Sequence, residues 1–233
     1  MPRLKDVMDN FDGRDWLEVA LDKYDQTTLR EPKVRDYFSP SSVHWCPRAI
    51  WYHMKGYEQD PIKANSVRRM MAGTVYHEFI EEKLKGSGIL VSAEEEVTWD
   101  DPPIVGHYDA IIERTTDKKH ILLEIKSMAE PKNKKYLQYL PKHEHLMQWN
   151  LYSMMTGLDE GIIFYINKNS QEYMIFPVER NDGIIENILK KLKKIKGYLD
   201  LDEEKIIPYL PDENHAWCNF QQTCERDHFT RGI

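Results

Sequence analysis

Apolar residues recur along this chain with two different periods. A spacing near 3.6 residues predicts helices at 14–24, 66–85, 142–156 and 188–199. The dipeptide Ser39-Pro40 indicates one more helix start, with the serine as N-cap and the proline in the first turn. The apolar residues that fit the helical period within 66–85 are Val67, Met70, Met71, Val75, Phe79 and Leu84.

Runs rich in valine and isoleucine predict strands at 89–99, 104–113 and 120–128, which are separated by short polar turns. An antiparallel meander is the most economical arrangement of these three strands. Two further strands are expected at 161–167 and 172–177. Helices and strands in this order predict a mixed α/β sheet with helices packed on its faces.

Length and composition favour one globular unit. The 233 residues are enough for one substantial core, and 41% hydrophobic with 30% charged residues is typical of a globular protein. We expect an N-terminal helical extension at 1–36 and a single domain at 37–233. The longest apolar run, of about five residues, is too short for a membrane span or a signal-peptide core. We therefore expect a cytoplasmic protein that does not contact a membrane.

The net charge of -7 argues against a protein that coats nucleic acid through a generally basic surface. Local lysines can still meet phosphates, and one such group consists of Lys132, Lys134, Lys135 and Lys142. The lysines within 188–199 alternate with apolar residues at helical spacing, so we expect them to form a solvated helix face.

Two acidic residues and a lysine lie on neighbouring predicted strands. Asp109 is on one strand, and Glu124 and Lys126 are two residues apart on the next, so both point to one face. The second strand has apolar neighbours that indicate burial, where a charge is costly unless it is paired or holds a metal. Two carboxylates can hold hard cations for phosphodiester hydrolysis, and a lysine can position or deprotonate the attacking water. The alternative is a salt-bridged strand pair.

Polar residues at helical spacing flank this strand pair. Gly73, His77 and Glu81 follow one another at intervals of four on the helix at 66–85, and therefore share a face. Gln148 and Tyr152 are four residues apart on the helix at 142–156. Taken alone, a histidine at this place is usually a packed core residue, and Gln148 with Tyr152 can be a polar cap on an apolar face.

The motifs G-x-x-x-H-x-x-x-E, G-x-x-D, E-x-K and Q-x-x-x-Y follow one another in this order. The chain thereby resembles the PD-(D/E)xK nuclease superfamily, in particular the RecB-family exonuclease domain and the CRISPR-associated adaptation exonucleases with an iron-sulfur cluster. The resemblance covers about residues 39–226, and the shared order makes it stronger than any one motif. It implies a restriction-endonuclease-like α/β core and a DNA nuclease activity.

The resemblance also implies a role for each motif residue. The metal ligands that it implies are His77, Asp109, Glu124 and the backbone carbonyl of Ile125. The catalytic residues that it implies are Asp109, Glu124, Lys126, Gln148 and Tyr152. Lys126 would activate water, Gln148 and Tyr152 would orient Lys126 or contact the phosphate, and Glu81 would support the ligands. The metal would be Mn²⁺ or Mg²⁺, and an imidazole ligand favours Mn²⁺ somewhat.

Three cysteines lie near the two ends of the domain. Iron-sulfur members of the resembled group carry one cysteine in a C-P-R context before the core and the pattern C-x-x-C-x5-C after it. The ligands thereby implied for a [4Fe-4S] cluster are Cys46, His215, Cys218 and Cys224, with His215 in place of one cysteine. Such a site would join Cys46 to the tail at 208–233. A structural Zn²⁺ site of three cysteines and a histidine, His228 as the fourth ligand, or three buried or free cysteines are the alternatives.

The leading hypothesis is a DNA exonuclease or flap-type nuclease that acts on single-stranded or frayed ends. The chain has no G-x-x-x-x-G-K-[ST] loop, so unwinding would come from a helicase or recombination partner. Trp45, Trp51 and Tyr52 are candidates for stacking on bases, although core packing explains at least two of them. A non-cutting nucleic-acid-binding scaffold is the second hypothesis, and a metallohydrolase of another phosphate ester is the third. The intact set of charged motif residues argues against the scaffold.

Overall fold

The structure, a computed structural model, describes residues 14–29, 31, 33–130, 134–201 and 218–231. Its main sheet has five strands in the order β1-β4-β5-β6-β7. These strands are β1 (Leu90–Ala93), β4 (Ala110–Glu113), β5 (His120–Met128), β6 (Glu160–Asn167) and β7 (Tyr173–Glu179). A separate two-stranded sheet consists of β2 (Glu96–Trp99) and β3 (Ile104–His107).

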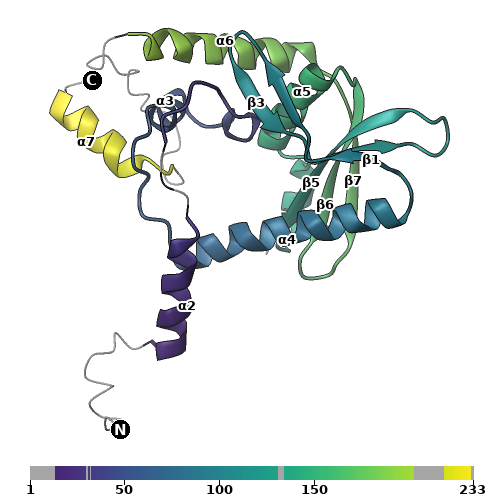
Figure 1. The fold of residues 1–233 in the computed structure, drawn as a ribbon, viewed down its shortest axis with the longest axis horizontal. Coiled ribbons are helices and arrows are strands. Elements are labelled where there is room, and N and C mark those ends of the chain that lie inside the picture. The colour runs from purple at the N-terminus through teal and green to yellow at the C-terminus, as the bar shows by residue number, and fades with distance from the viewer. Residues whose placement is uncertain (1–13, 30, 32, 131–133, 202–217, 232–233) are drawn as a thin grey trace.

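The strand directions require a crossover in the middle of the main sheet. β5 and β6 are parallel, and the other neighbouring pairs are antiparallel. A parallel pair cannot be joined by a tight turn, and here the chain passes through η2 (Lys134–Tyr139) and α5 (His143–Thr156). α5 lies on one face of the sheet and α4 (Ala64–Gly86) crosses the other (Figure 1). The expected mixed α/β sheet with helices on its faces is confirmed.

β5 is buried on both faces, because a layer of apolar side chains covers each. Leu123 and Ile125 point to the α4 face, where they pack in one cluster with Ile80. Leu122 points to the α5 face and packs with Trp149. A third cluster joins α3 (Pro47–Met54), α5 and α6 (Asp182–Leu199). The short helices η1 (Pro40–Ser42) and α7 (Gln221–Arg231) and the N-terminal helix α2 (Trp16–Thr27) complete the described elements.

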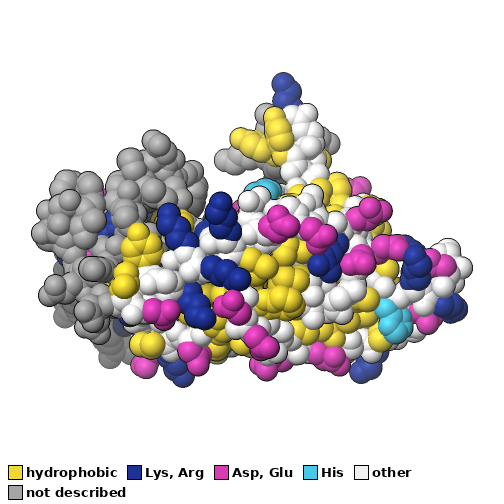
Figure 2. Space-filling view, turned by 90° about the horizontal axis from the view of Figure 1, so that it is seen from above, with side chains coloured by type: hydrophobic (Ala, Val, Ile, Leu, Met, Phe, Trp, Pro, Cys, Tyr) yellow, Lys and Arg dark blue, Asp and Glu magenta, His cyan; other side chains and the backbone are white. Residues whose placement is uncertain are grey.

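α6 matches the lysine-rich helix expected at 188–199. Its buried residues are Ile185, Ile188, Leu192 and Ile195. The face seen in Figure 2 carries acidic and basic side chains side by side, so no continuous basic surface covers it. Among the described helices, none combines the length and apolar character that crossing a membrane demands.

Two expected strands are each divided in two. The segment 89–99 forms β1 and β2, and the segment 104–113 forms β3 and β4. The division falls at Glu94, whose φ is 52° and whose N–H donates to the Tyr108 carbonyl at 3.1 Å. The expectation of two long strands is wrong, because both segments leave the main sheet at the same level and pair with each other in a second sheet.

The helix expected from Ser39 is interrupted. Only the single turn η1 follows Ser39, and α3 begins at Pro47. Cys46 immediately precedes Pro47, and its ψ is 151°. This agrees with the steric clash that keeps a residue before proline out of the helical region.

α4 agrees with the helix predicted at 66–85 but leaves exposed four of the six apolar residues that define its period. Met70, Met71, Val75 and Phe79 are between 41% and 61% exposed. The buried residues of α4 are Val67 and Ile80. The side of α4 nearest the sheet therefore includes polar residues, among them His77, whose ring reaches Asp109.

Candidate metal and active site

β5 extends beyond its neighbour β4, and this difference opens one end of the main sheet. The last pair in the β4/β5 register is Ala110 with Leu123, whereas β5 continues to Met128 beside β6. Asp109 immediately precedes β4 and therefore lies next to the unpaired edge of β5. Side chains from α4 and from α5 reach this opening from opposite faces of the sheet.

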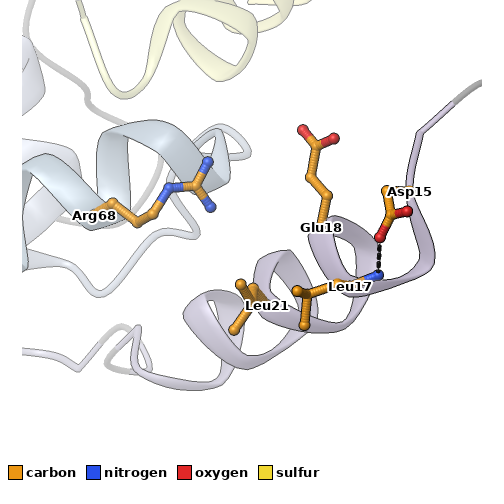
Figure 3. A pocket seen from close by; sticks show the side chains of 5 residues that line it. All are labelled: Asp15, Leu17, Glu18, Leu21 and Arg68. Carbon is orange, nitrogen blue, oxygen red and sulfur yellow. Dashed lines mark hydrogen bonds between the residues drawn. The ribbon is translucent and has the colours of Figure 1, made fainter.

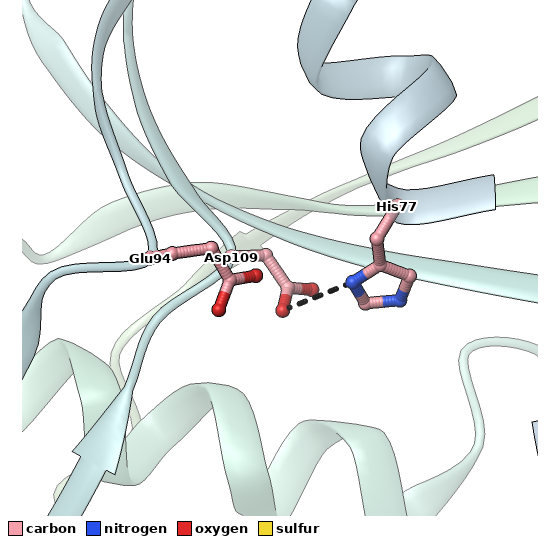
Figure 4. A group of neighbouring side chains, drawn as sticks. All are labelled: His77, Glu94 and Asp109. Carbon is pink, nitrogen blue, oxygen red and sulfur yellow. Dashed lines mark ion pairs between the residues drawn. The ribbon is translucent and has the colours of Figure 1, made fainter. Parts of the chain in front are cut away.

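Asp109 takes the place of the missing strand partner. Its Oδ2 atom accepts a hydrogen bond from the backbone N–H of Ile125 at 2.5 Å. Its Oδ1 atom lies 3.5 Å from Nδ1 of His77 on α4 (Figure 4). Burial opposes protonation of His77, but the hydrogen bond and negative charge of Asp109 outweigh it, so the pKa of His77 is raised.

Glu94 is a third potential ligand that the sequence interpretation missed. One ligand atom each of His77, Glu94 and Asp109 lie within 4.8 Å of one another (Figure 4). Opposite oxygens around Mg²⁺ are about 4.2 Å apart, so a small closure of the group would fit a cation. Burial and then the charge of Asp109 raise the pKa of Glu94, and Glu81 on α4 adds to this. The only sequence signal was the acidic run Glu94-Glu95-Glu96, which does not single out its first member.

Glu124 and Lys126 form a buried ion pair on the α5 face of β5. Glu124 is 1% exposed, and its Oε1 atom contacts the Lys126 ammonium group. Within the described residues, that oxygen has no hydrogen bond of ordinary geometry. Burial, followed by the charge of Asp109, raises the pKa of Glu124. Glu124 and Asp109 together carry two negative charges against the one ammonium group of Lys126, which fits a site that also takes a cation.

α5 brings the last motif over this ion pair. The Lys126 ammonium group donates to Oε1 of Gln148 at 3.3 Å. Tyr152, one turn further along α5, is 3% exposed, and burial followed by the charges of Glu124 and Asp109 raises its pKa. The structure thus brings together side chains that the sequence places on α4, β5 and α5 and before β4.

The glycines of the two glycine-containing motifs differ in their surroundings. A Cβ atom on Gly106 would lie 2.8 Å from the Tyr152 hydroxyl and 2.8 Å from Cδ of Pro40. The glycine of the G-x-x-D motif therefore allows β3 to pass close to α5. A Cβ atom on Gly73 of α4 would meet no atom within 4 Å.

This difference predicts opposite effects of adding one methyl group. We expect Gly106→Ala to lower the free energy of unfolding by about 1–3 kcal/mol, because Tyr152 and Pro40 must move. The matched control Gly73→Ala is expected to raise it by about 0.5–1 kcal/mol, because alanine is the better helix former. Urea unfolding followed by circular dichroism measures both. Equal stabilities of the two variants would contradict the packing role of Gly106.

The three cysteines lie around the cluster that joins α3 to the chain end. Cys46 and Cys218 accept hydrogen bonds from nearby backbone N–H groups and pack against this cluster, and Cys224 is buried in it. Burial is the main cause of the raised pKa of Cys224. Among the described residues, the three sulfur atoms are not all within 4.8 Å of one another. His215 and the side chain of His228 lie outside the described part of the chain.

The aromatic residues near Cys46 are mainly core residues. Trp51 and Tyr52 are 1% and 0% exposed, so neither can stack on a base. The Tyr52 hydroxyl donates to Oδ2 of Asp227 at 2.8 Å, which ties α3 to α7. Trp45 is half-buried and its ring makes an edge contact with His53, with centroids 5.4 Å apart.

A separate pocket lies between α2 and α4. It is lined by Asp15, Leu17, Glu18, Leu21 and Arg68 (Figure 3). Arg68 is ion-paired with Asp22 at 2.6 Å and with Asp25 at 2.7 Å, and Asp15 caps α2. These polar groups hold α2 in place, and none of the lining residues belongs to the acidic site.

No protein-family model and no curated protein matches this chain. The structure is similar to the crystal structure of SSO0001, with a TM-score of 0.57 and 21% identity over 90% of this chain and 96% of that one. It is also similar to LHK-Exo, an alkaline exonuclease from Laribacter hongkongensis, in complex with dAMP. That TM-score is 0.51, with 16% identity over 71% of this chain and 88% of that one. The described part of the chain therefore has the α/β fold of the restriction-endonuclease-like class.

Proposed function

We propose that this protein is a metal-dependent nuclease that hydrolyses phosphodiester bonds in DNA. The observation that carries the proposal is that Asp109 accepts a hydrogen bond from the backbone of β5 between Glu124 and Lys126, which pair with each other at the open end of the main sheet. All three are largely buried. Buried charges are expensive, so a binding scaffold without chemistry would gain nothing from keeping them there.

The residues present fit a hard divalent cation such as Mg²⁺ or Mn²⁺. His77, Asp109, Glu124 and the carbonyl of Ile125 would hold it, and Glu94 is near enough to His77 and Asp109 to join them. Carboxylate and carbonyl oxygens suit both ions, and the imidazole favours Mn²⁺. When bound, such a cation polarises a phosphate oxygen and lowers the pKa of a bound water.

The chain's own residues supply the remaining chemistry. Lys126 carries a raised pKa because the charges of Glu124 and Asp109 outweigh the cost of its burial, so its ammonium group stays protonated. A fixed ammonium group orients the attacking water and stabilises charge that develops on the phosphate. Gln148 holds that group through a hydrogen bond, and Tyr152 supports the same face of α5.

We further propose that the enzyme is an exonuclease that acts on single-stranded or frayed DNA ends. The similar structure of LHK-Exo is that of an alkaline exonuclease, and one of its structures contains dAMP. The carboxylates lie where β5 runs beyond the end of β4, and we expect the DNA strand end to reach them there.

A metal or cluster site at the two ends of the domain is part of the same proposal. Cys46 is far from Cys218 and Cys224 in sequence, but all three contact one core cluster, and His215 is the proposed fourth ligand. A [4Fe-4S] cluster or a Zn²⁺ ion there would hold α3 to the chain end. Iron and zinc analysis of anaerobically purified protein distinguishes the two, and His215→Ala should lower the metal content.

The test of the nuclease is cleavage of end-labelled DNA with Mn²⁺, Mg²⁺ or EDTA. We expect the wild type to cut only with a divalent cation. Asp109→Asn should lose cleavage by about two orders of magnitude or more, because it removes a ligand charge and keeps the side chain's shape. Electron paramagnetic resonance of Mn²⁺ should show weaker binding by the same variant.

The matched control is Asp117→Asn, which changes an exposed carboxylate in the turn before β5 and should cut like the wild type. Circular single strands should resist cleavage if a free end is required, and the product ladder from linear strands shows the polarity. A wild type that binds DNA but never cuts it, with any cation, would favour the scaffold instead.

A further inference from the structure

The segment η2 joins the two halves of the proposed active site. It follows β5, which carries Glu124 and Lys126, and precedes α5, which carries Gln148. The end of this segment is anchored beside the site, because the Lys142 N–H donates to the Tyr165 hydroxyl at 3.1 Å. Tyr165 is the register partner of Lys126 in the β5/β6 pair. The connection that contains η2 is therefore anchored at Lys142 beside the strand position of Lys126.

Two tyrosines of η2 are largely exposed. Tyr136 is 65% exposed and Tyr139 is 68% exposed. Within the described residues, neither ring makes a hydrogen bond or an aromatic contact. In a 3-10 helix, side chains three residues apart lie above one another, about 6 Å apart along the axis. The two rings therefore leave the same side of the segment, while Leu140 packs into the core beneath it.

The charge of the surrounding sequence is opposite to that of the whole protein. Residues 131–142 contain four lysines and no acidic residue, whereas the chain has a net charge of -7. Lys135 and Lys142 are both exposed, and Lys142 also pairs with Glu144 at 3.1 Å. Lysines around exposed aromatic rings are the combination that binds single strands, because phosphates meet the lysines and bases stack on the rings.

Resting on the nuclease function above, we propose that Tyr136 and Tyr139 form a base-stacking platform for the single-stranded end of the DNA substrate. Unpaired bases stack on the two rings, and the adjoining strand is thereby held at the acidic site. Stacking needs unpaired bases, so the platform favours single-stranded or frayed ends over intact duplex. Trp51 and Tyr52 cannot do this, because both are enclosed in the core.

Fluorescence anisotropy of a labelled single-stranded oligonucleotide, in EDTA to prevent cleavage, tests the platform. We expect Tyr136→Ala and Tyr139→Ala each to weaken binding about tenfold. Tyr136→Trp should bind as tightly as the wild type or tighter, because it keeps the stacking surface. Tyr24→Ala, which removes an exposed tyrosine from α2, is the matched control and should leave the affinity unchanged.

An abasic strand of the same length separates stacking from phosphate contacts. Wild type and both alanine variants should bind it equally and weakly. The platform would be overturned if the alanine variants bound the normal strand as tightly as the wild type. It would also be overturned if the alanine substitutions weakened binding to the abasic strand as much as binding to the normal strand. If the wild type cuts DNA in that case, the nuclease function stands without the platform. If the variants lose binding but the wild type never cuts, the platform stands without the nuclease.

Discussion

Replacing Lys126 by alanine is expected to lower the rate constant of DNA cleavage by about a thousandfold. The ammonium group is fixed between Glu124 and Gln148, so its place is set before the substrate arrives. The affinity for the metal should not fall with the cleavage rate, because Lys126 competes with a cation for Glu124. We therefore expect Lys126→Ala to bind Mn²⁺ at least as tightly as the wild type, whereas Asp109→Asn binds it more weakly.

Single-turnover cleavage with saturating Mn²⁺ measures the first effect, and paramagnetic resonance of free Mn²⁺ measures the second. Lys119→Ala is the control, because Lys119 is exposed, pairs with Glu160 and immediately precedes β5. Cleavage by Lys126→Ala at more than a tenth of the wild-type rate would remove Lys126 from the proposed chemistry. Loss of Mn²⁺ binding in this variant would show instead that it damages the ligand site.

Replacing Trp149 by alanine should have the largest effect on stability, lowering the free energy of unfolding by about 3–5 kcal/mol. Trp149 is fully buried, and its indole N–H donates to the Leu122 carbonyl at 3.2 Å. Its ring fills the space above Gly161, where an added Cβ atom would lie 2.6 Å from it. The substitution leaves a cavity between α5 and the strands β5 and β6, the first of which carries Glu124 and Lys126.

Urea unfolding followed by circular dichroism at 222 nm gives the stability of the variant without relying on tryptophan fluorescence. The control is Trp16→Ala on α2, where the side chain is 66% exposed and the expected change is within about 0.5 kcal/mol. If both variants lose the same stability, the α5 face of β5 is not the central packing layer of this fold.

Residues close together in sequence carried enough information to predict several elements. The period of 142–156 predicted the helix α5. Because residues four apart lie one helix turn apart, it also predicted that Gln148 and Tyr152 share a face. The spacing of Glu124 and Lys126 predicted that both lie on one face of β5, because side chains alternate along a strand. The packing reason for Gly106 was not readable, because its neighbours Pro40 and Tyr152 come from other elements.

The orientation of α4 shows the limit of periodicity. The pattern identified the helix correctly but not the face that it buries, because an exposed row of Met71, Val75 and Phe79 has the same spacing as a core face. Which face a helix presents to a sheet depends on the shape of that sheet. Here the sheet presents Asp109, and His77 turns toward it.

The sequence predicted a mixed succession of helices and strands, the shared strand face of Glu124 and Lys126, and the motif residues of the proposed site. The places where the strands break, the approach of Glu94 to His77 and Asp109, and the exposure of Tyr136 and Tyr139 became visible in the folded chain. The physical reason is that period and spacing report contacts within one element. The level at which β4 ends beside β5 depends on pairing between strands, and that pairing creates the open edge where the site forms.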